Sequence, residues 1–140
     1  VLCVEVSPSP GRAGCLHNSQ LAALAFRGLH TPICLVGHTH VPMVFEAPSR
    51  LSYPQWEEIT SYGLRDGTGH PLNSGRRYIC NPGSVGQPRD NDPRASYAIL
   101  DLNRAEFVVH RVDYDITAAN LASRRAGLPA RLGERLAIGA

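Results

Sequence analysis

Two histidines spaced two residues apart are the side chains of this 140-residue sequence most suited to chemistry. His38 and His40 belong to a Gly-His-Thr-His sequence at residues 37–40, directly after the apolar run at residues 33–36. Side chains two apart on an extended backbone point to the same side, so both imidazoles can converge on one metal ion. Neutral imidazole is the commonest protein ligand for such ions. The spacing therefore predicts metal ligation where a buried strand opens into a loop.

A second motif, Asn-Pro-Gly-Ser at residues 81–84, follows the short apolar run at residues 78–80. Proline and glycine at its centre predict a tight turn. Two roles are open for this turn. Its free amides and the Ser84 hydroxyl either face a phosphate or brace the histidine loop from behind.

Arg89 is the preferred phosphate-contacting side chain, because a planar guanidinium matches two phosphate oxygens at once. The alternative is a surface ion pair that holds the loop, either Arg89 with Asp90 or Arg94 with Asp92.

Together, the two motifs resemble those of the calcineurin-like metallophosphoesterases, in particular the small bacterial phosphodiesterase branch. The resemblance covers about residues 33–47 and 76–126. It implies a phosphodiesterase or phosphatase that hydrolyses a small phosphoester with water activated by two divalent ions, such as Mn, Zn, Fe or Mg. It also implies roles for individual residues: His38 and His40 as metal ligands, and Asn81, Ser84 and Arg89 as catalytic residues.

The same resemblance shows what the sequence lacks. The family's amino-terminal half carries Asp-x-His, Gly-Asp and Gly-Asn-His motifs, which supply most of the metal ligands, and none of them occurs here. The chain also begins inside an apolar stretch at Val1. We therefore expect the carboxy-terminal half of a longer phosphoesterase, nearly inactive alone, which binds a missing amino-terminal half or self-associates through uncovered strand edges.

One further departure lies at the first strand end. The family has a metal-binding His followed by Gly-Ser-Pro, whereas this chain has Glu-Val-Ser-Pro at residues 5–8. Glu5 is either a carboxylate ligand of the metal or a solvent-facing charge. The absent motifs and Glu5 favour an alternative function, a catalytically inactive interaction or scaffold module. The retained His38 and His40 oppose it.

Composition limits the other function classes. The net charge is only +2 and no basic run exceeds a pair, so no specific nucleic-acid surface is expected, whereas scattered arginines suit a small phosphorylated ligand. No stretch approaches the ~18 apolar residues that span a bilayer. The four cysteines lack Cys-x-x-Cys spacing and are expected as buried thiols of a cytoplasmic protein. His17, His30, His70 and His110 have no metal spacing to one another and receive no role.

The elements predicted around these motifs are mixed strands and helices. Asn18 or Ser19 caps a helix that ends near Gly28, and Asp115 caps another over residues 116–126. Strands are expected at residues 33–36, 43–46 and 78–80, a hairpin at 98–100 and 107–109, and a last helix at 131–137. Residues 47–76 are expected to form an irregular excursion or lid, with one hairpin near Asp66–Gly67.

The fold class expected is α/β. The resemblance implies the carboxy-terminal half of a layered α-β-β-α metallophosphoesterase sandwich, with residues 1–140 as a partial domain that ends in terminal helices over 116–137.

Overall fold

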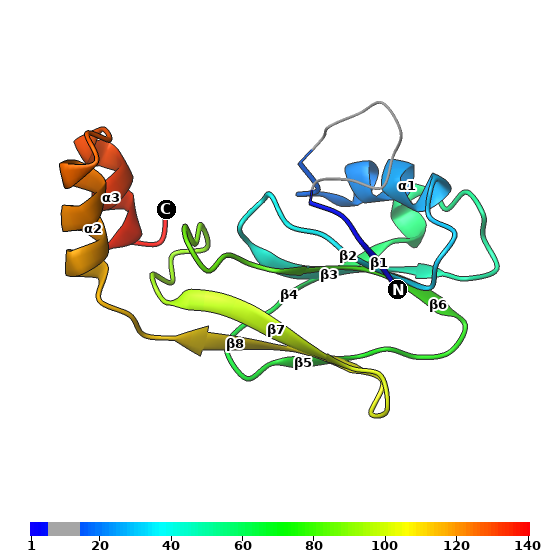
Figure 1. Cartoon of the computed structure of the whole chain (residues 1–140). Coiled ribbons are helices and arrows are strands. Elements are labelled where there is room, and N and C mark those ends of the chain that lie inside the picture. The colour runs from blue at the N-terminus through cyan, green and yellow to red at the C-terminus, as the bar shows by residue number, and fades with distance from the viewer. Residues whose placement is uncertain (6–14) are drawn as a thin grey trace.

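Two β-sheets lie face to face in the computed structural model, which describes residues 1–5 and 15–140 (Figure 1). The larger sheet contains β1 (Leu2–Cys3), β2 (Ile33–Leu35), β6 (Arg76–Pro82), β3 (Pro42–Pro48) and β4 (Thr60–Gly63), in that spatial order. The smaller sheet contains β5 (Gly69–Pro71), β8 (Glu106–Val112) and β7 (Ala95–Asp101), in that order. The helices are α1 (Ser19–Arg27), α2 (Ile116–Arg125) and α3 (Ala130–Leu136), with a short 3-10 turn, η1 (Trp56–Glu58).

The centre of the larger sheet brings the two sequence motifs together. β2 runs parallel to β6, with Leu35 opposite Cys80. Because parallel strands end at the same edge of a sheet, the loop after β2 and the turn after β6 emerge side by side. β3 then returns antiparallel to β6, with Pro42 opposite Pro82. The predicted strands at residues 33–36, 43–46 and 78–80 are all present, and the last two are longer than expected.

Helix α1 covers one face of the larger sheet. Asn18 caps it as predicted, since its Oδ1 accepts a hydrogen bond of 2.9 Å from the Leu21 amide, and Gly28 follows its last turn. Phe26 and three alanines of α1 are buried against β2, β3 and β6. A second apolar cluster, which includes Val44, Tyr78 and Phe107, fills the space between the two sheets. β2 is therefore covered on both faces, as its continuous apolar sequence indicated.

The smaller sheet is built on the predicted hairpin, which extends further than expected in both strands. β7 and β8 pair antiparallel from Ala95 opposite Val112 to Asp101 opposite Glu106. Phe107, Val109 and Arg111 are buried on one face of β8, whereas the residues between them are partly exposed.

The expected hairpin at Asp66–Gly67 is wrong. β4 pairs with β3 in the larger sheet and β5 pairs with β8 in the smaller one, so the turn between them passes from one sheet to the other. Residues 47–76 are thus only partly irregular, because they hold η1 and an edge strand for each sheet. A lid function for this segment stays a prediction.

The terminal helices pair with each other beyond the end of the smaller sheet (Figure 1). Asp115 caps α2 through a hydrogen bond of 2.8 Å from the Ala118 amide to its Oδ1, as predicted. No residue of α2 is buried. The tail after α3 returns to the loop before β7, where the Gly139 carbonyl accepts a hydrogen bond of 2.9 Å from the Asn91 amide.

The four cysteines are free thiols. Burial raises the pKa of Cys34 to about 11 and that of Cys80 to about 12, so both stay protonated near neutral pH. Cys3 and Cys15 are exposed. The expectation of a buried thiol is therefore wrong for both residues. Cys3 is exposed because β1 lies at the edge of its sheet.

A buried carboxylate links the two sheets far from the motifs. Glu46 on β3 lies 3.3 Å from His70 Nε2 on β5 through its Oε2, and 2.8 Å from Arg76 Nε through its Oε1. The side chains of Glu46 and His70 are 9% and 8% exposed. The His70 ring also contacts Tyr62 and Tyr78. Sequence spacing gave His70 no role, and its contacts here are structural.

The helices in the described part of the chain lack the length and apolar character of a membrane span.

Candidate metal and phosphate site

The histidine turn begins where β2 leaves the sheet. The Val36 amide donates to the Cys80 carbonyl at 2.9 Å, and the Gly37 amide donates to the Glu5 carbonyl at 2.9 Å. The backbone then turns sharply, with φ of 70° at His38 and 63° at His40. The extended geometry assumed from the spacing is therefore wrong. Left-handed conformations cost a non-glycine residue roughly 1–2 kcal/mol each and are concentrated at functional sites.

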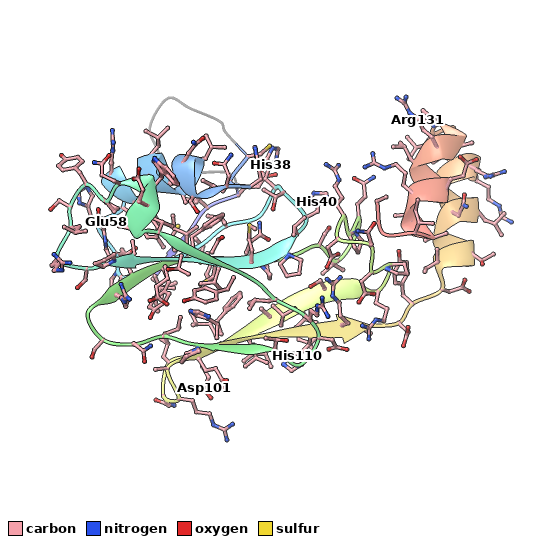
Figure 2. All side chains as sticks on the ribbon, turned by 180° about the vertical axis from the view of Figure 1, so that it is seen from behind. His38, His40, Glu58, Asp101, His110 and Arg131 are labelled. Atoms are coloured by element: carbon pink, nitrogen blue, oxygen red, sulfur yellow. The ribbon has the colours of Figure 1, made fainter. Side chains whose placement is uncertain are left out.

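Both imidazoles nevertheless line the same cavity, of about 460 Å³, at the end of the larger sheet (Figure 2). Its walls are formed by Cys15, His17, His38, Thr39, His40, Val41, Met43 and Arg89. His17 received no role from the sequence, because it lies 21 residues from His38 and shares no motif with it. The loop before α1 carries it to this wall.

A single contact fixes the His40 ring. Its Nδ1 lies 2.6 Å from the Gln87 carbonyl oxygen, and since a carbonyl only accepts, Nδ1 carries the proton. The lone pair of a neutral ring is then on Nε2, which is the arrangement of a metal-ligating histidine held by a backbone carbonyl. The Arg89 amide donates to the His40 carbonyl at 3.2 Å. The His38 side chain is exposed, and no hydrogen bond to its ring is found in the described part of the chain.

Asn81 supports the histidine turn from behind. Its Nδ2 donates to the Gly37 carbonyl at 2.8 Å and to Thr39 Oγ1 at 2.9 Å, while its Oδ1 accepts from the Gly83 amide at 2.9 Å. The residue is 1% exposed. Asn81 thus makes the contacts of a brace, one of the two roles left open by the sequence. A direct catalytic role for it stays a prediction.

The rest of the Asn-Pro-Gly-Ser turn is packed against β7. Gly83 has φ of +88°, and a Cβ added there would lie 2.7 Å from Ser96 Oγ, so only glycine fits. Ser84 Oγ accepts a hydrogen bond of 3.0 Å from the Gln87 amide. The Ser84 hydroxyl therefore shapes the loop that holds His40, and its predicted contact with substrate stays a prediction.

Arg89 lies on the wall of the histidine cavity and is exposed. Its Nη2 donates to Gln87 Oε1 at 2.9 Å, and it makes no ion pair with a described carboxylate. Asp90 instead contacts Arg111. Of the two ion pairs considered from the sequence, only Arg94–Asp92 is found, at 2.7 Å. The charge of Arg89 therefore remains available to an anion in the cavity.

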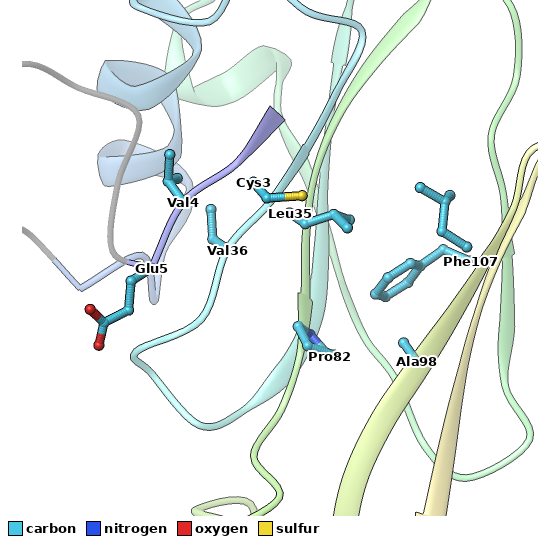
Figure 3. A pocket seen from close by; sticks show the side chains of 9 residues that line it. Cys3, Val4, Glu5, Leu35, Val36, Pro82, Ala98 and Phe107 are labelled. Carbon is cyan, nitrogen blue, oxygen red and sulfur yellow. The ribbon is translucent and has the colours of Figure 1, made fainter. Parts of the chain in front are cut away.

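Glu5 is not on the wall of the histidine cavity. It is exposed and stands at the rim of a separate cavity of about 420 Å³, between β1 and β2 on one side and β7 and β8 on the other (Figure 3). Its carboxylate points away from the apolar side chains Leu35 and Phe107 there (Figure 3). Metal ligation by Glu5 stays a prediction, and the Val-Ser-Pro that follows it lies outside the described residues.

The donors around the histidine cavity suit part of a divalent-metal site. His40 offers a lone pair whose direction is set by Gln87, and His38 offers an imidazole without a competing hydrogen bond among described residues. A closed site for Zn or a similar ion needs about four ligands. No group of three histidines, cysteines or carboxylates that could hold an ion is found in residues 1–5 and 15–140. The residues therefore fit a metal ion as two of its ligands.

The fold matches that of a solved metallophosphoesterase from Sphaerobacter thermophilus, with a TM-score of 0.84 and 41% sequence identity. The match covers 99% of this chain and 54% of that one. The chain thus has the calcineurin-like metallophosphoesterase fold over the half that it spans, as the two motifs indicated. The α/β fold class is confirmed.

Two further proteins are similar. The uncharacterized protein MJ0912 of Methanocaldococcus jannaschii is 37% identical over 107 residues, which are 76% of this chain and 39% of that protein. The hypothetical protein PH1004 of Pyrococcus horikoshii matches at a TM-score of 0.59 and 17% identity, over 99% of this chain and 46% of that one, and so shares the fold. No family model matches the chain.

The left-handed turn leads to a stability prediction. Replacing His38 by glycine should raise the free energy of unfolding by about 1 kcal/mol, because glycine adopts positive φ without a clash. His38→Ala should give no such gain, because alanine keeps the strain. Ala105, at φ of 51° in the β7–β8 turn, supplies the control: Ala105→Gly should stabilise by a similar amount. Urea unfolding measures all three. A His38→Gly variant no more stable than His38→Ala would show that the turn is unstrained.

A cluster of ion pairs at one end of the smaller sheet leads to a prediction of how stability depends on pH. Its members are Asp66, Asp90, Asp92, Arg94 and Arg111. The Arg111 amide lowers the pKa of Asp66 by a hydrogen bond of 2.9 Å, and the Arg94 guanidinium lowers that of Asp92. Because both pKa values are lower in the folded than in the unfolded chain, the stabilisation is present above about pH 4, the unfolded value. It is lost as pH falls through the folded values. Urea unfolding at descending pH should show that the free energy of unfolding falls less steeply in Asp66→Asn/Asp92→Asn than in the wild type. The same dependence on pH in both proteins would contradict this.

Proposed function

We propose that this chain supplies part of a divalent-metal phosphoesterase site that hydrolyses a small phosphoester with water. The observation that carries the proposal is the histidine turn itself. The backbone of both histidines is left-handed, and their imidazoles lie on one cavity wall beside an arginine that makes no ion pair with a described carboxylate. Such strain persists only where the surroundings enforce it, and it is typical of sites that hold a ligand. The match to a solved metallophosphoesterase supports the same reaction class.

The chain's own residues have distinct tasks in this proposal. His38 and His40 hold the metal through neutral imidazoles, and Gln87 keeps the proton of His40 on Nδ1. Asn81 fixes the turn that carries both rings. Arg89 binds phosphoryl oxygens and lessens their charge as water attacks. A divalent ion, when bound, supplies the Lewis acid that polarises the phosphoester and lowers the pKa of the attacking water.

The size of the cavity supports a small substrate. Its volume of about 460 Å³ lies in the range of sites for small molecules, roughly 300–1,000 Å³. A phosphodiester or phosphomonoester of modest size fits this space better than a macromolecular duplex would.

The remaining ligands would come from polypeptide beyond these 140 residues, either another segment of the same protein or a second copy of the chain. The chain spans about half of the solved metallophosphoesterase. In the described residues, β1 and β7 are edge strands, and the apolar cavity of about 420 Å³ opens between their sheets (Figure 3). Unpaired strand edges beside an uncovered apolar wall are a suitable docking surface for further strands.

Phosphate binding and hydrolysis test the proposal. In the presence of manganese, inorganic phosphate should bind the chain at least about tenfold more weakly in Arg89→Ala, because a charge-assisted contact is lost. Arg104→Ala is the matched control, since Arg104 is 81% exposed in the β7–β8 turn. Isothermal titration calorimetry measures both. Equal phosphate affinity in the two variants would remove Arg89 from the site.

Hydrolysis of bis-p-nitrophenyl phosphate by the chain alone is expected to be negligible. Manganese-dependent turnover by the purified 140 residues would contradict the proposal that the other ligands lie outside them.

An inactive interaction module is the second candidate. It is favoured by one observation, that no group of three potential ligands forms within the described residues. The two candidates differ in metal content. A scaffold has no need of metal, whereas a phosphoesterase half-site should retain measurable affinity through His38 and His40.

A further inference from the structure

The loop between β6 and β7 holds the histidine turn at two points. The Gln87 carbonyl accepts from His40 Nδ1 at 2.6 Å, and the Arg89 amide donates to the His40 carbonyl at 3.2 Å. The same loop places the Arg89 side chain on the cavity wall. Both proposed functions of this loop, orienting a ligand ring and presenting a cation, thus depend on where residues 87–89 lie.

The far end of this loop is fixed by a residue of the other sheet. Arg111 on β8 has a side chain that is only 1% exposed. Its Nη2 contacts Asp90 Oδ2, its Nη1 donates to the Arg94 carbonyl at 3.1 Å, and its Nε lies 3.7 Å from Asp92. The guanidinium therefore contacts the loop at three residues, starting with the neighbour of Arg89.

We infer that Arg111 is a positioning residue of the metal site, which holds the β6–β7 loop so that Gln87 orients the His40 ring and Arg89 faces the cavity. The inference rests on the proposed function, since it treats His40 as a ligand. It extends the site to a residue on the smaller sheet, which no motif in the sequence connects with the histidines.

The chemistry of the contact requires arginine. One planar guanidinium donates in two directions at once, to a carboxylate and to a backbone carbonyl, whereas a lysine ammonium is a single point charge on a flexible stem. Removing the guanidinium also leaves Asp90 partly buried without its cation, and such a carboxylate moves toward water. Movement of Asp90 displaces Arg89 and Gln87 on the same short loop.

Another arginine of the cluster offers a contrast. Arg94 pairs with Asp66 and Asp92 and is 34% exposed, but no ion pair between it and Asp90 is found among the described residues. If the cluster acted only through overall stability, both arginines would affect His40 alike. If Arg111 positions the loop, only Arg111 and Asp90 matter to the ring.

Nitrogen NMR of the metal-free chain tests this directly, because protonated and unprotonated ring nitrogens of histidine have different chemical shifts. Measurement at about pH 8 keeps ordinary imidazoles neutral. The signals of His40 are assigned by their loss in His40→Asn. The wild type should show a single tautomer with the proton on Nδ1. Arg111→Met and Asp90→Asn should both lose that single tautomer and gain the form protonated at Nε2.

Arg94→Met is the matched control and should leave the His40 tautomer unchanged. An unchanged tautomer in both Arg111→Met and Asp90→Asn overturns the inference, and so does an equal change in Arg94→Met. If Arg111→Met fails to fold, Asp90→Asn decides alone, since it keeps the shape of the side chain. The measurement needs neither metal nor substrate, so a failure of the proposed function leaves its outcome readable.

Discussion

Replacing His38 and His40 together by alanine is expected to weaken manganese or zinc binding by at least about a hundredfold. Even residues that only orient a ligand cost about 10–100-fold in metal affinity when removed, and this variant removes the two proposed ligands themselves. The loss should be large because the described residues contain no third ligand near enough to compensate. Elemental analysis after purification in manganese and zinc, followed by titration calorimetry, measures the effect.

The control for this experiment removes two other imidazoles. His30 is exposed, and His110 stacks on Tyr97 in the smaller sheet at a ring distance of 5.2 Å, so neither lines the histidine cavity. His30→Ala/His110→Ala should keep the metal affinity of the wild type. Equal losses in the two double variants would mean that metal binds adventitiously to surface histidines. Negligible metal in the wild type would favour the scaffold over the phosphoesterase half-site.

Replacing Glu46 by alanine is expected to lower the free energy of unfolding by about 3 kcal/mol, the lower end of the range for breaking a buried ion pair. The carboxylate is 9% exposed and joins His70 on the smaller sheet to Arg76 on the larger one. Its loss leaves His70 buried without a partner for Nε2 and frees β5 from β3. Arg76 reaches solvent, at 42% exposure, which keeps the expected loss from being larger.

Urea unfolding measures this change, with Glu57→Ala as the control. Glu57 is exposed in η1 and should be replaced at little cost. Glu46→Gln should lie between the two, because the amide keeps the shape and one acceptor oxygen. A Glu46→Ala variant as stable as Glu57→Ala would show that Glu46, His70 and Arg76 contribute nothing net to the fold, since buried pairs can cost as much to desolvate as they return.

Local signals in the sequence predicted the helix ends well. Asn18 and Asp115 each bond to an amide three residues later, and that contact depends only on the adjacent chain. The apolar runs likewise predicted β2, β3 and β6, because a strand buried on both faces needs a continuous apolar sequence. That the two motifs belong to one site followed from the family resemblance. The structure gives the physical reason: β2 and β6 are parallel neighbours, so the loops that follow them lie side by side.

Contacts between residues far apart in the chain could not be predicted from the sequence. His40 is oriented by Gln87, 47 positions away, and the histidine turn is left-handed because the surrounding loops enforce it. His17 reaches the cavity only through the placement of α1. The Asp-Gly sequence at residues 66–67 correctly indicated a turn, because turn formation depends on adjacent residues. It did not indicate which strands pair, because β4 pairs with β3 and β5 with β8, and both partners are distant in the sequence.

The left-handed turn also limits how this protein can be improved. A selection that ranks variants by thermal stability alone should enrich glycine at positions 38 and 40, because each glycine relieves strain. The same variants would lose both imidazoles from the cavity. Under the proposed function, directed evolution of this chain therefore needs metal retention as a second criterion, because the glycines that stabilise positions 38 and 40 remove both proposed ligands.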